Sequence, residues 1–150
     1  MQLTFEEARL LMKSIQMTNG ASYNPVAKVL NPLSGYMVAV PGYSKVTTRV
    51  WNTLDLMCVV NEWLHANARI YADRKITGIA GIYIGLWEHE GKLYLDLSQR
   101  ISSRASAINL GKDRKQLAIY DCYNTCDIDL VPKVKVEYEI DADIITDKLY

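Results

Sequence analysis

The clearest pattern along the chain is a pair of apolar runs joined by a short polar segment. The runs 81–87 and 92–98 are rich in β-branched and aromatic residues, and Glu88-His89-Glu90-Gly91 lies between them. Strand-forming runs of this length on either side of a short polar link are typical of a β-hairpin. The pattern therefore predicts two paired strands, and the rest of the chain is arranged around them.

A helix and a further strand are predicted directly after this hairpin. Ser102 or Ser103 can cap a helix that carries Ile108, and Gly111 stands where a helix commonly ends. The run 116–121 then returns to the strand pattern.

The N-terminal part predicts a helix, a punctuated loop and a short strand. Thr4 and Glu7 form a capping-box pattern, and apolar residues then recur at helical spacing up to Asn19-Gly20. Turn residues are frequent between 19 and 35, which predicts a structured loop or a pair of small strands. Residues 36–40 form a nearly continuous apolar run before a Pro-Gly turn, which predicts a strand covered on both faces.

A second, longer helix is predicted to begin at a Thr53 cap. Its mostly apolar stripe consists of Leu54, Met57, Cys58, Asn61, Leu64, Ala68 and Tyr71. Val59, Val60 and Trp63 make this stripe wider than one sheet face requires. We therefore expect the helix to pack against the first helix or a second subunit, and we expect a homo-oligomer, most simply a symmetric dimer.

The last strong pattern is the polar and apolar alternation of residues 133–140, which predicts a strand with one wet face. The predicted order is helix, strand, helix, strand, strand, helix, strand, strand, without strict alternation of strand and helix. This order predicts an α+β fold, with a mixed, mainly antiparallel sheet and helices packed on one face. We expect a single domain over residues 1–150.

Composition and charge narrow the class of partner. The 150 residues include 17 basic and 17 acidic side chains, so the formal net charge is zero and we expect no duplex nucleic acid as a partner. The three cysteines lack paired spacing, and no secretion leader or long apolar run is present. We expect a cytoplasmic protein with reduced thiols and no membrane contact.

No catalytic or cofactor motif is recognisable, so we expect neither a cofactor nor enzymatic activity. Cys122 and Cys126 would need metal ligands from elsewhere in the chain, and we interpret them as structural. Asp96 and Asp121 are of a type suited to acid–base chemistry, but aspartates at strand ends more often cap backbone donors.

The candidate site is a group of basic and amide side chains in and after the third predicted helix, together with aromatic residues of neighbouring strands. The chosen residues are Arg104, Asn109, Lys112, Arg114, Gln116, Trp87 and Tyr120. Basic side chains suit phosphate, amides suit base edges, and aromatic rings stack on bases, so this combination predicts a concave nucleotide site. Loss of Arg104 or Arg114 should then weaken binding with little effect on stability. The alternative interpretation is a solvated helix face.

Several segments also resemble small proteins encoded by bacteriophages and integrated elements. These segments are 34–42, Gly85-Leu86-Trp87, 94–98, Ala107-x-x-x-Gly111 and 116–121. The small size and the Lys-Gln-x-Ala-Ile ending are similar to the sponge proteins that phages use against Thoeris defence, although Lys115 stands where asparagine is expected. The resemblance implies an oligomeric binder that sequesters cyclic ADP-ribose isomers, or related cyclic nucleotide signals, without cleaving them.

Two other functions stay open beside this one. The first is a protein–protein inhibitor or adaptor from a phage or mobile element, which would present a flat exposed apolar or acidic patch. The second is an enzyme that acts on a nucleotide, which would need a carboxylate, thiol or histidine with an oriented partner near the substrate.

Overall fold

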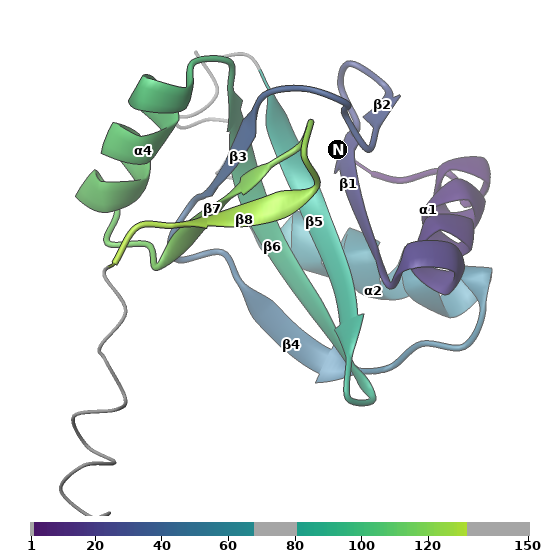
Figure 1. The fold of residues 1–150 in the computed structure, drawn as a ribbon. Coiled ribbons are helices and arrows are strands. Elements are labelled where there is room, and N and C mark those ends of the chain that lie inside the picture. The colour runs from purple at the N-terminus through teal and green to yellow at the C-terminus, as the bar shows by residue number, and fades with distance from the viewer. Residues whose placement is uncertain (1, 68–80, 132–150) are drawn as a thin grey trace, which may run out of the picture.

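The computed structural model describes residues 2–67 and 81–131, and within them three helices pack on an eight-stranded sheet (Figure 1). The helices are α1 (Phe5–Thr18), α2 (Thr53–Ala66) and α4 (Arg104–Asp113). The strands are β1 (Gly20–Asn24), β2 (Val29–Leu30), β3 (Tyr36–Ala39), β4 (Lys45–Thr48), β5 (Ile82–His89), β6 (Lys92–Ile101), β7 (Ala118–Asp121) and β8 (Cys126–Asp129).

The long strand β6 organises the sheet. Along one side it pairs with β5, and along the other it pairs with β4 at its start and with β3 at its end. The strand order is β2-β1-β5-β6-β3-β7-β8, and all of these pairings are antiparallel. The predicted hairpin is therefore confirmed. Its turn is Glu90-Gly91, and both residues have positive φ, which is the conformation that matches the twist of the two strands.

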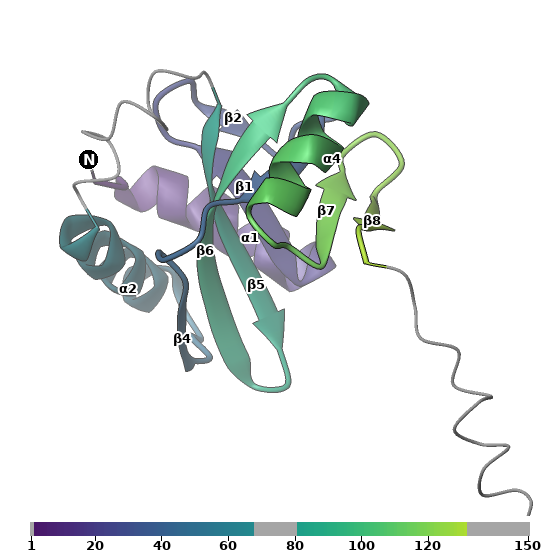
Figure 2. The ribbon, with the colours of Figure 1, turned by 90° about the vertical axis from the view of Figure 1, so that its left-hand side faces the viewer.

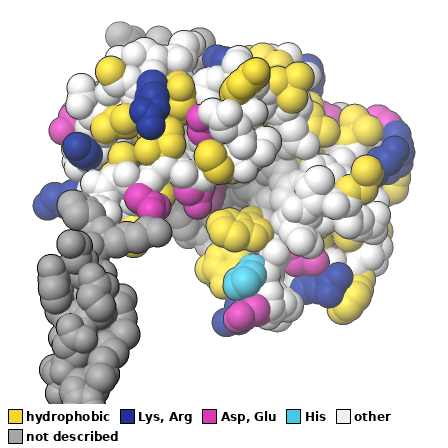
Figure 3. All heavy atoms as spheres, viewed as in Figure 1, with side chains coloured by type: hydrophobic (Ala, Val, Ile, Leu, Met, Phe, Trp, Pro, Cys, Tyr) yellow, Lys and Arg dark blue, Asp and Glu magenta, His cyan; other side chains and the backbone are white. Residues whose placement is uncertain are grey.

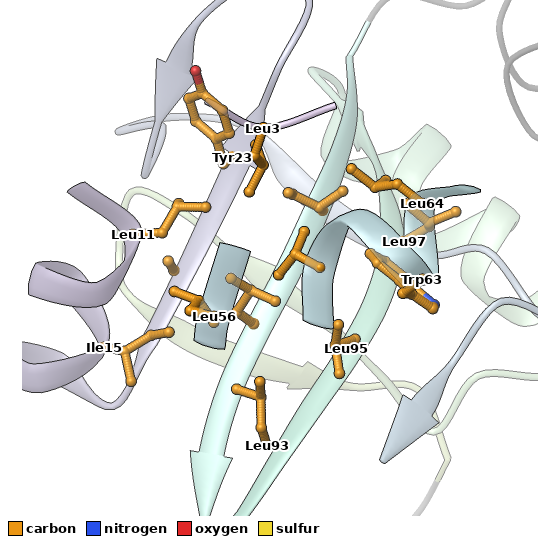
Figure 4. Close-up of a cluster of buried hydrophobic side chains, with 14 of the residues drawn as sticks. Leu3, Leu11, Ile15, Tyr23, Leu56, Trp63, Leu64, Leu93, Leu95 and Leu97 are labelled. Atoms are coloured by element: carbon orange, nitrogen blue, oxygen red, sulfur yellow. The ribbon is translucent and has the colours of Figure 1, made fainter. Parts of the chain in front are cut away.

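All three helices cover the same face of this sheet. Alternate residues of β5 and β6 form the main core with α1 and α2 (Figures 2 and 4). Ile82 of β5 is paired with Gln99 of β6, and Gln99 is paired with Val38 of β3. Paired residues point to the same side of a sheet, so Val38 points to the side of the main core. Val38, Ala107 and Ile119 form a second buried cluster beneath α4. The predicted α+β fold with helices on one face is confirmed.

Helix α1 begins and ends where the sequence predicts. The Glu7 amide donates to Thr4 Oγ1, and the Thr4 amide donates to Glu7 Oε1, at 3.1 and 3.0 Å. At the other end Asn19 adopts a left-handed conformation, with φ of 66°, and its amide donates to the Ile15 carbonyl. The Glu7 carboxylate also accepts bonds from the Tyr23 hydroxyl and from Lys28 Nζ, so it ties the helix to the following strands.

Glu7→Ala should lower the free energy of unfolding by about 1–2 kcal/mol near neutral pH, because it removes half of the capping box and both further bonds. Burial alone would raise the pKa of Glu7, but the bonds from Tyr23, Thr4 and Lys28 outweigh it and lower the pKa to about 2. The stabilisation is therefore complete above the ordinary pKa of glutamate and is lost as the pH falls through about 2. Urea denaturation at several pH values measures this, with exposed Glu6→Ala as the matched control.

Helix α2 exists, but the predicted orientation of its buried face is wrong. Asn52 caps it in place of Thr53, with its side chain accepting from the Asp55 amide. The buried residues are Leu56, Val60, Trp63 and Leu64, whereas Leu54 and Cys58 are exposed. Ala68 and Tyr71 lie outside the described residues. The buried face packs on β5 and β6 in the main core, and the Trp63 indole N–H donates to the Tyr43 carbonyl, at 2.8 Å.

The orientation of α2 also removes the reason given for self-association. Val60 and Trp63 were predicted to widen the apolar stripe beyond what packing on one sheet face requires. In the structure both are buried within this chain. The other edge of α2 meets the N-terminal segment, where the Leu3 amide donates to Asn61 Oδ1 and Asn61 Nδ2 donates to the Leu3 carbonyl. A homo-oligomer stays a prediction, now without this support.

Helix α4 is capped by Ser103, one of the two predicted residues, but Gly111 does not end it. The helix continues to Asp113, and Gly111 lies buried within it. A Cβ at this position would lie 2.6 Å from Leu130 Cδ1 and 2.8 Å from Ile119 Cγ2. The glycine therefore allows α4 to pack closely on β7 and on the segment after β8.

Two strands were not predicted from the sequence. They are β4, between the Pro-Gly turn and α2, and β8, in a segment rich in cysteine and aspartate. Both have mainly exposed side chains, as strands near a sheet edge commonly do. The strand predicted over residues 133–140 lies outside the described residues.

Candidate ligand-binding face

The face of the sheet opposite the helices is open, and we call it the open face. The β7–β8 hairpin projects in front of β5 and β6 on this side, as the two ribbon views together show (Figures 1 and 2). The surface is hollowed beside β5, between this hairpin and the end of the sheet that carries the β5–β6 turn (Figure 3). A concave surface that no helix covers is the natural place for a ligand.

Strand register arranges the side chains of the open face in rows across the sheet. One row contains Val46, Tyr94 and Trp87, and the next contains Asp96 and Gly85. Beyond them come a row with Ser98 and Tyr83 and a row with Arg100, Met37, Tyr120 and Asp127.

The first row forms an exposed aromatic end. Trp87 keeps 57% of its surface open, and its ring centroid lies 6.3 Å from that of Tyr94 and 6.2 Å from that of His89. Val46, opposite Tyr94, is also exposed. Lys92 comes two residues before Tyr94 on β6, so its side chain points to the same face. An apolar platform therefore lies next to a cationic side chain.

Asp96 places a carboxyl group in the middle of the open face. Its cross-strand neighbour is Gly85, and a Cβ at that position would overlap Asp96 Oδ1. The absence of a side chain at Gly85 thus makes room for the Asp96 carboxyl group. Burial raises the pKa of Asp96 to about 6, although a hydrogen bond from the Ser98 side chain acts in the opposite direction. Within residues 2–67 and 81–131, no basic side chain forms an ion pair with it.

The far end of the open face is closed by packing. Arg100 folds over Gly35 and donates from Nε to the Ser34 carbonyl and from Nη2 to Ser34 Oγ, both at 2.8 Å. Met37, Tyr83 and Cys122 form a small buried cluster there, and burial raises the pKa of the Cys122 thiol.

Most of the basic residues predicted for the site lie on or near α4, on the other side of the sheet. Arg104, Asn109 and Lys112 are exposed along this helix. Arg114 instead points to the sheet, where Nη1 donates to the Ala39 carbonyl at 3.1 Å and Nη2 donates to Gln99 Oε1 at 2.7 Å. Burial lowers the pKa of Arg114. The expectation that Arg114 is a free phosphate ligand with little structural role is therefore wrong.

The structure does not bring the seven predicted site residues together. Trp87 and Tyr120 lie on the open face, whereas α4 covers the opposite one. Gln116 lies in the link after α4 and donates to the Arg114 carbonyl, at 3.2 Å. Only the aromatic part of the predicted set belongs to the open face.

The loop between β7 and β8 is organised by Asp121. Its Oδ1 accepts from the Tyr123 and Asn124 amides and its Oδ2 from Asn124 Nδ2, and these bonds lower its pKa. The interpretation of Asp121 as a cap for backbone donors is confirmed. Cys122 is buried and Cys126 exposed, and in the described part of the chain no three histidine, cysteine or acidic residues are grouped to hold a metal.

Asp96 is not among the site residues predicted from the sequence. The signal that could have found it is Gly85, a glycine inside an otherwise apolar strand. Counting outward from a two-residue turn at Glu90-Gly91 pairs Gly85 with Asp96.

Comparison with models of known protein families, with curated proteins and with solved structures finds no match. None of the helices in the described ranges is long and apolar enough to cross a membrane. Function is therefore inferred from the geometry of the open face and from the sequence.

Proposed function

We propose that this chain is a phage-type anti-defence protein that binds and sequesters a cyclic nucleotide signal, such as a cyclic ADP-ribose isomer or a related molecule, without cleaving it. The sequence resemblance suggests this class of protein. The observation that carries the proposal is the exposed Trp87 beside Tyr94 on the helix-free face of the sheet, a face that is hollowed beside β5 (Figure 3). The proposed site is accordingly the open face and not the outer surface of α4.

The aromatic end suits a nucleobase. An exposed indole beside a second ring offers a flat apolar surface, and stacking a base on such a ring contributes roughly 1–3 kcal/mol to binding. The hollow beside β5 provides depth for the rest of the ligand, so that more of its surface is removed from water than on a flat sheet.

The charges on the same face suit the phosphates of the ligand. Lys92 and His89 lie next to the aromatic row, at the end away from Asp96. The Asp96 carboxylate repels phosphate, so a nucleotide that stacks on Trp87 would direct its phosphates toward Lys92. This arrangement gives the ligand one preferred orientation.

Sequestration requires tight binding and slow release and does not require a group that breaks bonds. The proposal therefore places the protein in the host cytoplasm, where it lowers the free concentration of the signal. A second subunit could contribute to binding, and self-association remains part of the proposal.

The test is to incubate the protein with a panel of cyclic nucleotides, remove unbound ligand, denature the protein and identify what is released by mass spectrometry. We expect intact ligand. Altered ligand would favour the nucleotide-acting enzyme, and the absence of any bound nucleotide would favour the protein–protein inhibitor or adaptor.

Trp87→Ala should weaken binding of the captured ligand by roughly tenfold to hundredfold, because it removes the stacking surface. The matched control is Trp51→Ala. Trp51 is more exposed still, at 72%, but it lies outside the strands, and its ring packs against the Arg49 guanidinium. Titration calorimetry compares the two variants. Equal losses in both would contradict the assignment of the open face.

A further inference from the structure

We propose that Asp96 selects the ligand, because its carboxylate accepts two N–H bonds from a guanine-type edge of a base stacked on Trp87. This inference rests on the proposed nucleotide-binding function. It narrows the proposed ligand class to cyclic nucleotides that carry guanine or a heterocycle with the same pair of donors, and so excludes the adenine-containing cyclic ADP-ribose isomers.

The position of Asp96 brings its carboxyl group within reach of such a base. Side chains two residues apart on one face of a strand stand roughly 7 Å from one another. Asp96 is two residues from Tyr94 on β6, and its partner Gly85 is two residues from Trp87 on β5. Because Gly85 has no side chain, the Asp96 carboxyl group lies over β5, in the row next to that of the indole, where the edge of a base stacked on Trp87 could reach it.

The hydrogen-bonding capacity of Asp96 indicates a ligand that donates. An ionised carboxylate offers about four acceptor positions. Within the described part of the chain, the Ser98 side chain forms a hydrogen bond with the Asp96 carboxyl group, and this bond acts to lower its pKa. The half-buried carboxylate therefore has acceptor positions left for a ligand, and two N–H groups of one base edge could fill them.

The guanine edge fits this requirement better than the adenine edge. Guanine presents a ring N–H and an exocyclic amino group side by side, so both can donate to one carboxylate. Adenine presents an amino group beside a ring acceptor, and it would pair fully only with a protonated carboxyl group. The pH dependence of binding therefore separates the two possibilities.

Other charged or titratable groups on the open face must be separated from Asp96 in such a test. Those on β5 and β6 are Tyr83, His89, Lys92, Tyr94 and Arg100, those on β7 and β8 are Tyr120, Asp127 and Asp129, and the Cys122 thiol lies in the cluster with Met37 and Tyr83. The open-face positions of β1, β3 and β4 carry residues that do not titrate: Gly20, Ser22, Asn24, Met37, Ala39, Val46 and Thr48. His89 is the main competitor, so the His89→Gln variant is the control.

The experiment uses cyclic GMP and cyclic IMP as probes, because cyclic IMP lacks only the exocyclic amino group. Near neutral pH we expect the protein to bind cyclic GMP about tenfold to hundredfold more tightly. Below about pH 6, affinity for cyclic GMP should fall about tenfold for each pH unit, since protonation of Asp96 removes the acceptor. Asp96→Asn should lose both the preference and the pH dependence. His89→Gln removes a group near the proposed phosphate position, so it should weaken binding of both nucleotides alike and keep the preference for cyclic GMP and its loss on acidification.

Two outcomes would overturn the inference while the proposed function stands. One is equal, Trp87-dependent binding of cyclic GMP and cyclic IMP. The other is tighter binding of cyclic AMP than of cyclic GMP, with affinity that rises on acidification. Failure to bind any cyclic nucleotide of the panel would overturn both proposals.

Discussion

Asp96→Asn is expected to stabilise the fold near neutral pH by about 1–3 kcal/mol, although it removes a charged side chain from the middle of a strand. Burial raises the pKa of Asp96 from its ordinary value of 3.8 to about 6. The folded chain therefore binds a proton more tightly than the unfolded chain does. Above about pH 6 the ionised carboxylate destabilises the fold, and this cost shrinks as the pH falls and disappears below the unfolded pKa.

Urea denaturation of the parent and of Asp96→Asn, near neutral pH and near pH 4, measures this effect. The gain in stability should be present at the higher pH and small at the lower one. The control is Asp113→Asn, an exposed aspartate at the end of α4, which should change little. A loss of stability in Asp96→Asn at both pH values would show that the carboxylate is structural. A gain would agree with a group kept for binding at a cost to stability.

Arg114→Ala should lower the free energy of unfolding by about 2–4 kcal/mol. The substitution removes the donors to Gln99 Oε1 and to the Ala39 carbonyl. Gln99 is completely buried, and its Nε2 has no hydrogen-bond partner within the described ranges. Without Arg114, neither Oε1 nor Nε2 of Gln99 would have a hydrogen-bond partner within the described ranges. The end of α4 would also lose its hydrogen bonds to β3 and β6.

Arg104→Ala is the matched control, since Arg104 is exposed at the start of the same helix and should contribute less than about 1 kcal/mol. Thermal denaturation should show a clear drop in melting temperature for Arg114→Ala and almost none for Arg104→Ala. Arg114→Lys should recover only part of the loss, because lysine lacks the planar fork that reaches two acceptors. Equal melting temperatures of the two alanine variants would contradict the structural role of Arg114.

The elements that sequence analysis predicted correctly are those with local signals. The Thr4 and Glu7 capping box fixes the start of α1, and the Glu90-Gly91 turn fixes the β5–β6 hairpin. The apolar run of β3 is buried at its two central residues, Met37 and Val38, as a strand covered on both faces requires.

The buried face of α2 could not be predicted in the same way. Apolar residues surround much of this helix, and exposed Leu54 and Cys58 are as apolar as the buried Leu56 and Val60. Periodicity therefore does not determine which side faces the sheet, and that side is known only from the packing of the main core. The α4 glycine, Gly111, was misinterpreted because a helix stop and a close packing contact have the same residue signature.

The candidate site was only partly predictable because residue type does not reveal the face of a sheet. Arg114 and Trp87 both suit a nucleotide, but α4 places the arginine on the covered side. Strand register, in contrast, was within reach. A two-residue turn pairs Gly85 with Asp96 and Trp87 with Tyr94, which is the arrangement from which the open face is built.

Because all three helices lie on one side of the sheet, residues needed for folding and residues available for binding alternate along the same strands. In β5 and β6, every second residue contributes to the core, and a change there puts folding at risk. The intervening residues, such as Trp87, Tyr94 and Ser98, face the open side and are not part of that core. Substitutions on the open side can therefore change what that face binds while the core, and with it the architecture, stays the same.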